Sequence, residues 1–323
     1  PEGDLLERAG GTFSFDEKIA AMKAGLARLA GFGVTSAVAM SADPEEFEVL
    51  AALEERGELT LRVFYSPSLL GDLDAYEVLR GRANGPLLRF GWLKGFVDGV
   101  IESKTAALLE PYAESSERGT PALAAAQLNA LVADAQARGF STALHAVGDA
   151  AARAGLDAYA AADRSYKRPA RRRRLEHLEI LDPADMPRFK GLDVAASMQP
   201  LHAVPAGPAG DGAWSRNLGP QRRARSFAWR ALLDAGAVLS FGSDWTVASP
   251  NPLEGFAAVS GRLTPEEAVR AYTAGPAYGA GLERELGCLD PGCLADLVVL
   301  GPGSLETGKV RAVVVDGRVV TSE

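Results

Sequence analysis

The sequence predicts an α/β protein whose main part is a (β/α)8 TIM barrel, followed by part of a small β-sandwich. Short runs rich in β-branched residues alternate with longer Ala/Leu-rich stretches of helical periodicity, the pattern of βα units around a parallel sheet. The 323 residues suffice for one large barrel. From residue 284 the pattern changes to short strand-like runs separated by turns. We therefore expect an incomplete barrel at residues 1–283 and the C-terminal part of a β-sandwich at residues 284–323.

Seven barrel strands are predicted before the tail, at residues 33–40, 59–65, 93–97, 141–147, 175–180, 194–199 and 237–243. Helices are predicted at 15–31, 44–56, 72–83, 121–138, 149–162, 183–190, 222–235, 252–259 and 264–274, and tail strands at 287–300 and 310–320. A closed barrel of this kind needs eight strands. Because the chain begins at Pro1 in a polar segment without an initiator Met, we expect strand 1 to lie outside this sequence.

The overall charge favours a small-molecule substrate over a polyanionic partner. A net charge of −8 argues against binding to nucleic acid or to an anionic membrane. The basic run Arg171–Arg174 is the exception, and such a run usually forms a solvated face. No stretch approaches the roughly 18–20 apolar residues that span a bilayer, and nothing resembles a secretion signal. The sequence leaves the oligomeric state open, a homo-oligomer included.

The two cysteines, Cys288 and Cys293, lie in the segment Cys-Leu-Asp-Pro-Gly-Cys. A zinc site needs more ligands than this pair, and no histidine lies nearby in the sequence. Asp-Pro-Gly is typical of a turn between two short strands. We expect a cytoplasmic protein with free thiols rather than a disulfide.

All three histidines lie at or just beyond the ends of predicted strands. His145 and His177 end two consecutive strands, His202 follows the next one, and Asp244 lies at the tip of the last. The C-terminal strand ends of a barrel meet at the active site, and imidazole and carboxylate are ligands of Zn²⁺. Each residue also has a structural explanation: a histidine after a strand is often only hydrogen-bonded, and Asp244 could cap the next helix.

Eight segments together resemble amidohydrolase family 3, the branch that includes N-substituted formamide deformylases. They are Leu-Lys-Gly-Phe-Val-Asp-Gly (93–99), Thr-Ala-Ala-Leu-Leu-Glu-Pro-Tyr (105–112), Leu-His-Ala-Val-Gly-Asp-Ala-Ala (144–151), Leu-Glu-His-Leu (175–178), Ser-Met-Gln-Pro-Leu-His (197–202), Phe-Gly-Ser-Asp-Trp (241–245), Ala-Tyr-Thr (271–273) and Leu-Asp-Pro-Gly-Cys-Leu-Ala-Asp-Leu-Val-Val-Leu (289–300). The resemblance covers nearly the whole chain, in family order, and implies a metal-dependent hydrolase barrel truncated at its N-terminus.

The resemblance also implies a metal site with one or two divalent ions, with zinc the expected metal. Strand 1 of similar enzymes ends in a His-x-His pair, and no such pair occurs here, in agreement with a missing first strand. Lys94 matches the lysine that CO₂ carboxylates to bridge two metals, although it could instead be an ion-pair partner. His145 and His177 match the ligands of the second metal, and Asp244 matches the carboxylate of the last strand.

Asp244 is also the expected catalytic residue. A carboxylate beside the metal can accept a proton from the attacking water and pass it to the leaving nitrogen.

Other residues are expected around this centre. Asp149 would orient a ligand or cap its helix, and Asp98 would shape the loop that carries Lys94. His202 is expected to contact substrate, with a surface histidine as the alternative. Trp245 is expected to line the pocket rim or to pack beneath it.

The chain departs from the family pattern between Gly255 and Thr264, where the family usually carries a longer segment. This departure puts the loop that would close over the substrate in doubt.

The leading functional hypothesis is hydrolysis of a C–N bond, in an amide, an N-formyl group or a related group, by a metal-activated water. Two alternatives stay open: ester or lactone hydrolysis on the same barrel, and a non-catalytic paralogue or fragment that lacks the His-x-His strand.

Overall fold

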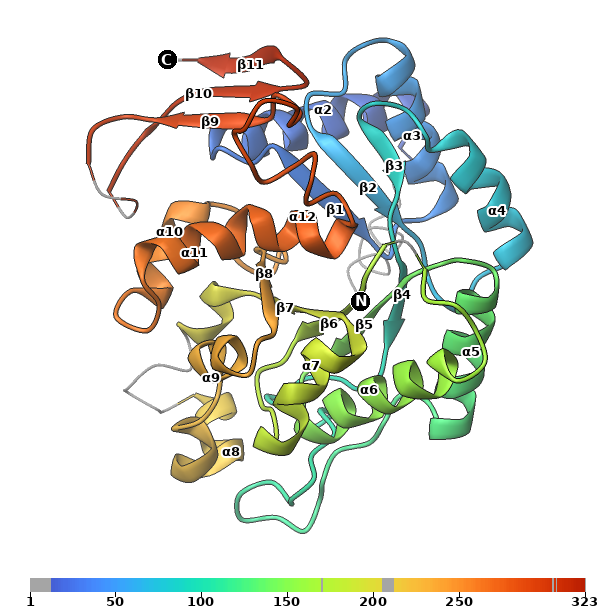
Figure 1. Ribbon diagram of the computed structural model, residues 1–323, viewed down its shortest axis with the longest axis vertical. Helices are drawn as coiled ribbons and strands as arrows, with labels where there is room; N and C mark the ends of the chain where they lie inside the picture. Colours follow the sequence, from blue (N-terminus) through green and yellow to red (C-terminus); the bar gives the residue numbers. More distant parts are fainter. Residues whose placement is uncertain (1–12, 170, 205–211, 304, 306, 323) are drawn as a thin grey trace.

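A computed structural model describes residues 13–169, 171–204, 212–303, 305 and 307–322. Parallel strands form its centre and helices surround them (Figure 1). The strands are β1 (Ser36–Met40), β2 (Arg62–Ser66), β3 (Leu88–Phe90), β4 (Leu93–Phe96), β5 (Thr142–Ala146), β6 (Arg173–His177), β7 (Val194–Met198) and β8 (Val238–Phe241). Every residue of β2, β5, β6 and β7 is buried, as expected for parallel strands covered on both faces. The predicted α/β barrel architecture is confirmed.

Two short strands, β3 and β4, together occupy one strand position of the barrel. Only Gly91 and Trp92 separate β3 from β4, and β3 pairs with β2 whereas β4 pairs with β5. At this bend the Trp92 N–H donates to Ser66 Oγ at 2.9 Å, and a β-carbon on Gly91 would lie 2.3 Å from the same oxygen. Glycine is needed at position 91 because any side chain there would collide with Ser66 Oγ. The eight parallel segments thus fill seven strand positions, the number counted from the sequence. Among the described residues, no strand pairs with the free edges of β1 and β8.

Helices follow the strands and cover the outside of the sheet (Figure 1). They are α2 (Phe15–Gly31), α3 (Pro44–Glu55), α4 (Leu73–Arg82), α5 (Ala125–Ala137), α6 (Asp149–Asp163), α7 (Met186–Leu192), α8 (Ala213–Arg223), α9 (Trp229–Asp234), α10 (Pro252–Val259), α11 (Pro265–Tyr272) and α12 (Ala274–Ala280), with 3-10 turns η1 (Pro183–Asp185) and η2 (Pro200–Ala203). Capping boxes fix the start of α2, through Ser14 and Glu17, and of α11, through Thr264 and Glu267. Between α10 and α11 the chain makes a short turn.

The prediction of one helix at 222–235 is wrong. The helix α8 begins earlier, at Ala213, because Trp214 and Leu218 bury one face of it. It ends before Phe227, which has a left-handed φ of 47° and donates its N–H to the carbonyl of Glu179 at 2.9 Å. This tertiary contact has no local sequence signal, so the break between α8 and α9 could not be predicted.

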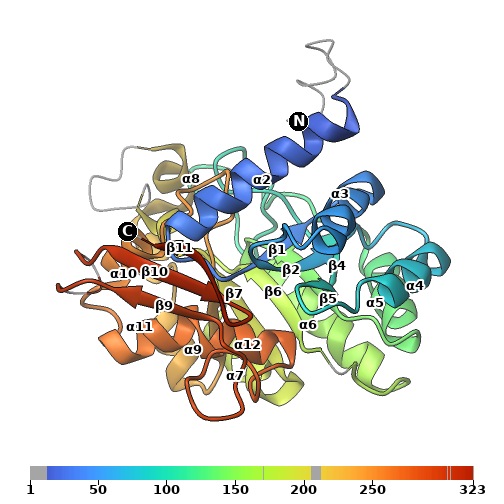
Figure 2. The ribbon, with the colours of Figure 1, turned by 90° about the horizontal axis from the view of Figure 1, so that it is seen from above.

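The tail forms an antiparallel sheet of β9 (Leu297–Leu300), β10 (Val310–Val315) and β11 (Arg318–Ser322), which lies beside α2 (Figure 2). The second predicted tail strand is a hairpin, because Asp316 and Gly317 both adopt positive φ at its turn. Arg62, buried at the start of β2, joins the barrel to the tail. Its Nε lies 2.9 Å from Asp296 Oδ2 and its Nη2 lies 3.0 Å from Oδ1.

The expectation of free thiols is wrong, since Cys288 and Cys293 form a disulfide. The Asp-Pro-Gly turn, closed by the Cys293 N–H donating to the Asp290 carbonyl at 3.0 Å, brings the two cysteine Cα atoms to 6.1 Å. That separation lies within the range that a disulfide spans. The cytoplasmic location expected with free thiols stays a prediction. Within the described ranges, no helix is long and apolar enough to cross a bilayer.

The basic run Arg171–Arg174 does not form a solvated face, and that prediction is also wrong. Arg173 and Arg174 belong to β6, in the middle of the five-stranded sheet, where their side chains are buried. Arg173 pairs with Asp163 at 2.7 Å, and Arg174 pairs with Glu176 at 2.9 Å. Carboxylates in or next to the sheet therefore compensate the charges of these two buried arginines.

Candidate active site

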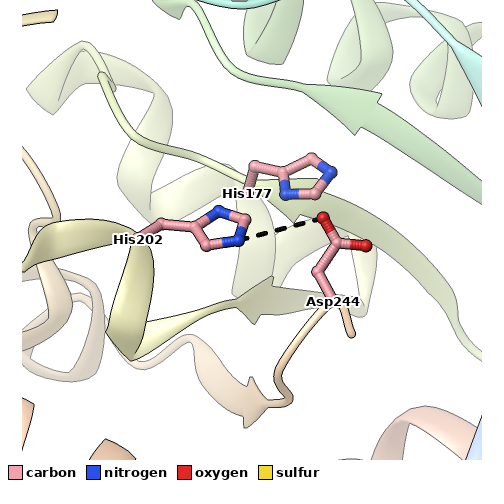
Figure 3. A group of neighbouring side chains, drawn as sticks. All are labelled: His177, His202 and Asp244. Atoms are coloured by element: carbon pink, nitrogen blue, oxygen red, sulfur yellow. Dashed lines mark ion pairs between the residues drawn. The ribbon is translucent and has the colours of Figure 1, made fainter. Parts of the chain in front are cut away.

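Three polar side chains meet at the C-terminal ends of the barrel strands (Figure 3). His177 is the last residue of β6, His202 lies in η2 just after β7, and Asp244 follows β8. One potential ligand atom from each lies within 4.8 Å of the other two. His202 Nε2 and Asp244 Oδ2 are 3.9 Å apart. Parallel strands end at one face of the sheet, so residues distant in sequence converge there.

The backbone at these strand ends is strained. His177 and the following Leu178 have φ of 79° and 51°, and Asp244 has φ of 56°. The left-handed region is uncommon for residues other than glycine and costs on the order of 1 kcal/mol or more per residue. Strain of this kind is concentrated at functional sites, where the surrounding structure must maintain it.

Neighbouring side chains hold His177 in a form suited to a metal. Its Nδ1 lies 2.8 Å from Gln199 Oε1, an acceptor, so Nδ1 carries the proton and Nε2 keeps its lone pair. The His202 ring stacks on the His177 ring at a centroid distance of 5.8 Å. Burial lowers the pKa of His177 well below its usual value, and the adjacent His145 lowers it further. A neutral imidazole is the form that binds a metal.

His145, on β5, packs edge-on against His177 with 4.4 Å between ring centroids. Its Nε2 lies 2.9 Å from the Gly99 carbonyl, in the loop after β4, and 3.8 Å from Asp98 Oδ1. Burial lowers the pKa of His145 to about 4. His145 is therefore also neutral near pH 7 and lies against His177, outside the group of potential ligand atoms that His177, His202 and Asp244 form.

The two aspartates predicted around the centre both bind backbone N–H groups. Asp98 accepts from Ala107, Val147 and Gly148 at 2.9–3.0 Å and so joins the ends of β4 and β5. Burial raises the pKa of Asp98 to about 7, against the effect of these donors.

Asp149 accepts from Leu109 at 2.8 Å and from Ala150, in the first turn of its own helix, at 3.0 Å. The structure thus places Asp149 as an anchor of the loop that follows β4.

Lys94, on β4, is buried beneath this cluster, with its Nζ 5.1 Å from the centre of the Phe96 ring. Burial lowers the pKa of Lys94, while the negative charges of Glu176 and Asp244 oppose that shift. A lowered pKa favours the neutral amine, the form that can react with CO₂.

Trp245, directly after Asp244, is exposed, and its ring lies against Gly25 of α2. A β-carbon at Gly25 would be 3.9 Å from that ring.

Sequence reasoning missed Gln199, Glu179 and Trp214. Glu179 Oε1 lies 3.8 Å from His202 Nδ1, and the Trp214 indole donates to Glu179 Oε2 at 2.5 Å. Burial raises the pKa of Glu179 to about 7. The position of Glu179, two residues after His177 and just beyond a strand end, was the one available signal.

Comparison with known proteins identifies the family of this chain. Residues 3–321 match the model of the amidohydrolase family. The chain is 31% identical to Protein LONG AFTER FAR-RED 3 of Arabidopsis thaliana, over 71% of this chain and 41% of that protein. It is 28% identical to the N-substituted formamide deformylase of Arthrobacter pascens, over 77% of this chain and 47% of that protein. The chain thus spans less than half the length of these two relatives.

A solved structure supports the same assignment. A metal-dependent hydrolase from Pyrococcus furiosus superimposes with a TM-score of 0.75 at 26% identity, covering 87% of this chain and 59% of that one. The family model covers nearly all of the chain, and the resemblance found in the eight segments is confirmed. The chain belongs to the amidohydrolase family.

Proposed function

We propose that the protein is a metal-dependent hydrolase that cleaves a C–N bond in a small molecule, such as an amide or an N-formyl group. The observation that carries this proposal is the convergence of His177, His202 and Asp244 at the C-terminal face of the barrel. Family membership and the name of the formamide deformylase relative support it.

The residues present fit a divalent metal. Burial keeps the imidazoles neutral, and His202 Nε2 is buried without a hydrogen-bond partner in the described residues. Two imidazoles and one carboxylate are a ligand set that leaves a zinc coordination position open for water or substrate. His145 lies beside this set, and Lys94, carboxylated by CO₂, would serve a second ion. The metal would supply Lewis-acid activation of water and of the substrate carbonyl.

The protein groups then have distinct tasks. Asp244 accepts the proton of the attacking water and delivers it to the leaving nitrogen, which must be protonated before the C–N bond breaks. Gln199 keeps the proton on His177 Nδ1. Glu179, which accepts a hydrogen bond from the Trp214 indole, lies beside His202 and positions it. Trp245 would border the entrance to the active site.

A panel of chromogenic substrates tests the proposal. N-formyl and N-acyl anilides are compared with esters of the same acyl groups, before and after treatment with a chelator. We expect anilide hydrolysis that is lost on chelation and restored by Zn²⁺ or Mn²⁺. Turnover of esters alone would favour the ester-hydrolase alternative. Hydrolysis that survives complete metal removal would contradict the proposal, and a metal-loaded protein inactive on the whole panel would favour the non-catalytic alternative.

A further inference from the structure

A cleft lies among the N-terminal ends of the barrel strands, at the end opposite to His177 and Asp244. It has a volume of about 450 Å³, and Arg80, Arg89 and Arg171 line it together with Phe140 and Leu282. Arg89 is in β3, Arg171 lies just before β6, and Leu282 follows α12. Clefts of roughly 300–1,000 Å³ accommodate small ligands.

Arg171 differs from the three arginines that follow it in sequence. Arg172, Arg173 and Arg174 each pair with a carboxylate, at distances of 2.7–3.1 Å. Arg171 instead donates to three backbone carbonyls, those of Phe90, Ala280 and Gly91, at 2.7, 2.8 and 3.3 Å.

The other two arginines of the cleft also have no acidic partner. In the part of the chain that the structure describes, neither Arg80 nor Arg89 forms an ion pair with a carboxylate, and the same holds for Arg171. The cleft therefore carries uncompensated positive charge.

Two of the three guanidinium groups are held in place. The Arg171 guanidinium lies over the rings of Phe64 and Trp92, at 5.3 and 5.2 Å, and the Arg80 guanidinium lies 4.1 Å from the centre of the Phe140 ring. A guanidinium has five N–H donors, so the three carbonyl contacts of Arg171 leave two donors without an acceptor in the described residues.

Arg89 completes the arrangement. It is partly exposed, and no side-chain hydrogen bond of Arg89 is present among the described residues. Burial, and then the nearby charge of Arg89, lower the pKa of Arg171 to about 10, so Arg171 is still cationic at neutral pH. Their mutual repulsion would be relieved by an anion between them.

We propose that this cleft binds a phosphate group carried on a small molecule. Arginine suits this role because its planar fork of donors matches the oxygens of phosphate. Arg171 forms the fixed base of the site, Arg89 closes on the anion from the exposed side, and Phe140 and Leu282 contact the organic part of the ligand. The site is separate from the hydrolase centre and does not depend on the proposed reaction.

Isothermal titration of the full chain with inorganic phosphate and with phenyl phosphate tests this proposal, at constant ionic strength set by NaCl. We expect saturable 1:1 binding, tighter for phenyl phosphate because its ring reaches the apolar wall. Arg89→Gln should weaken binding by about tenfold or more, the usual effect of losing a charge-assisted hydrogen bond. Arg89→Lys should recover part of it.

Arg164→Gln is the matched control, because Arg164 is exposed and forms no ion pair among the described residues, and its loss changes the net charge equally. Arg80→Gln gives a second test if Arg89→Gln fails to fold, as judged by circular dichroism. No saturable binding of either ligand to the wild type would overturn the proposal. Equal weakening by Arg164→Gln would also overturn it, since binding would then reflect overall charge alone.

Discussion

Asp244 holds a left-handed backbone conformation at the point where β8 leaves the sheet, and this conformation places its carboxylate opposite His202. If Asp244 transfers the proton, replacing it with asparagine should keep most of the bound metal, because the amide oxygen can still act as a ligand. The turnover number of Asp244→Asn should fall by about 10²–10⁴-fold, the usual contribution of a general base. Parallel measurement of kcat and metal content checks this prediction. An Asp244→Asn enzyme with wild-type turnover would exclude Asp244 as the base.

Glu179 gives a prediction about pH. Burial raises its folded-state pKa to about 7 from an ordinary value of 4.5, so between these pH values the folded state binds more protons than the unfolded state. The contribution of Glu179 to stability therefore decreases as pH rises through this window. A glutamine at position 179 would still accept a hydrogen bond from the Trp214 indole, but it would not titrate.

Glu179→Gln should consequently gain stability relative to the wild type as pH rises from 5 to 8, by up to about 3 kcal/mol. Urea unfolding at a series of pH values, with metal removed from both proteins, measures the difference. A difference that is constant with pH would show that Glu179 titrates normally in the folded protein.

At the scale of single residues, the sequence predicted the site residues that lie at strand ends. His145, His177 and Asp244 could be found because each lies at or just after the end of a predicted strand. Gln199 and Glu179 could not be assigned a role, since their contacts depend on how η2 and α8 return to the barrel. The place of His202 beside His177 and Asp244 depends on the same return of the chain.

The element β6 shows how a strand in the middle of a sheet incorporates charged residues. Arg173 is buried and donates to both oxygens of Asp163, whereas the more exposed Arg168 reaches the same carboxylate from the surface, at 2.7 Å. Replacing Arg173 with alanine would leave Gln136 Oε1 and the Tyr159 and Leu192 carbonyls without this donor, and each such loss in the interior costs about 1–3 kcal/mol. Exposed pairs contribute about 1 kcal/mol or less.

Arg173→Ala should therefore lower the free energy of unfolding several times more than Arg168→Ala, although both variants lose one arginine from the same carboxylate. Denaturant unfolding of the two variants compares them directly. Equal destabilisation would show that burial does not determine the strength of this pair.

The helices and strands of the barrel were predicted well where hydrophobic residues recur with a regular period. The errors have specific causes. The segment 88–90 was missed because the bend at Gly91 divides one strand between two partners. The basic run was misjudged because the carboxylates that neutralise it come from α6 and from β6 itself. Neither cause is visible in local periodicity.

At the scale of the whole molecule, the tail sheet is joined to the barrel through Arg62. Asp296 makes two contacts with its guanidinium, while Asp316 lies 3.6 Å away with a side chain that is 36% exposed. Asp296→Ala would leave the Arg62 charge buried without its main partner, and we expect a loss of about 3–5 kcal/mol.

Limited proteolysis and thermal unfolding check this prediction. The tail of Asp296→Ala should become sensitive to protease at temperatures where the wild type is resistant, and Asp316→Ala should lose about 1 kcal/mol or less. Resistance of the Asp296→Ala tail equal to that of the wild type would mean that other contacts hold the sheet.

The proposed function depends on a metal bound at the C-terminal face of the barrel. Equilibrium dialysis against Zn²⁺, followed by elemental analysis, measures it for the wild type, His177→Ala and His202→Ala. Asp134→Ala, which removes an exposed carboxylate from α5, is the control. We expect about one tightly held zinc ion or more per chain in the wild type and the control, and a loss of at least one ion in both histidine variants. Wild-type zinc content in His177→Ala and His202→Ala would contradict it.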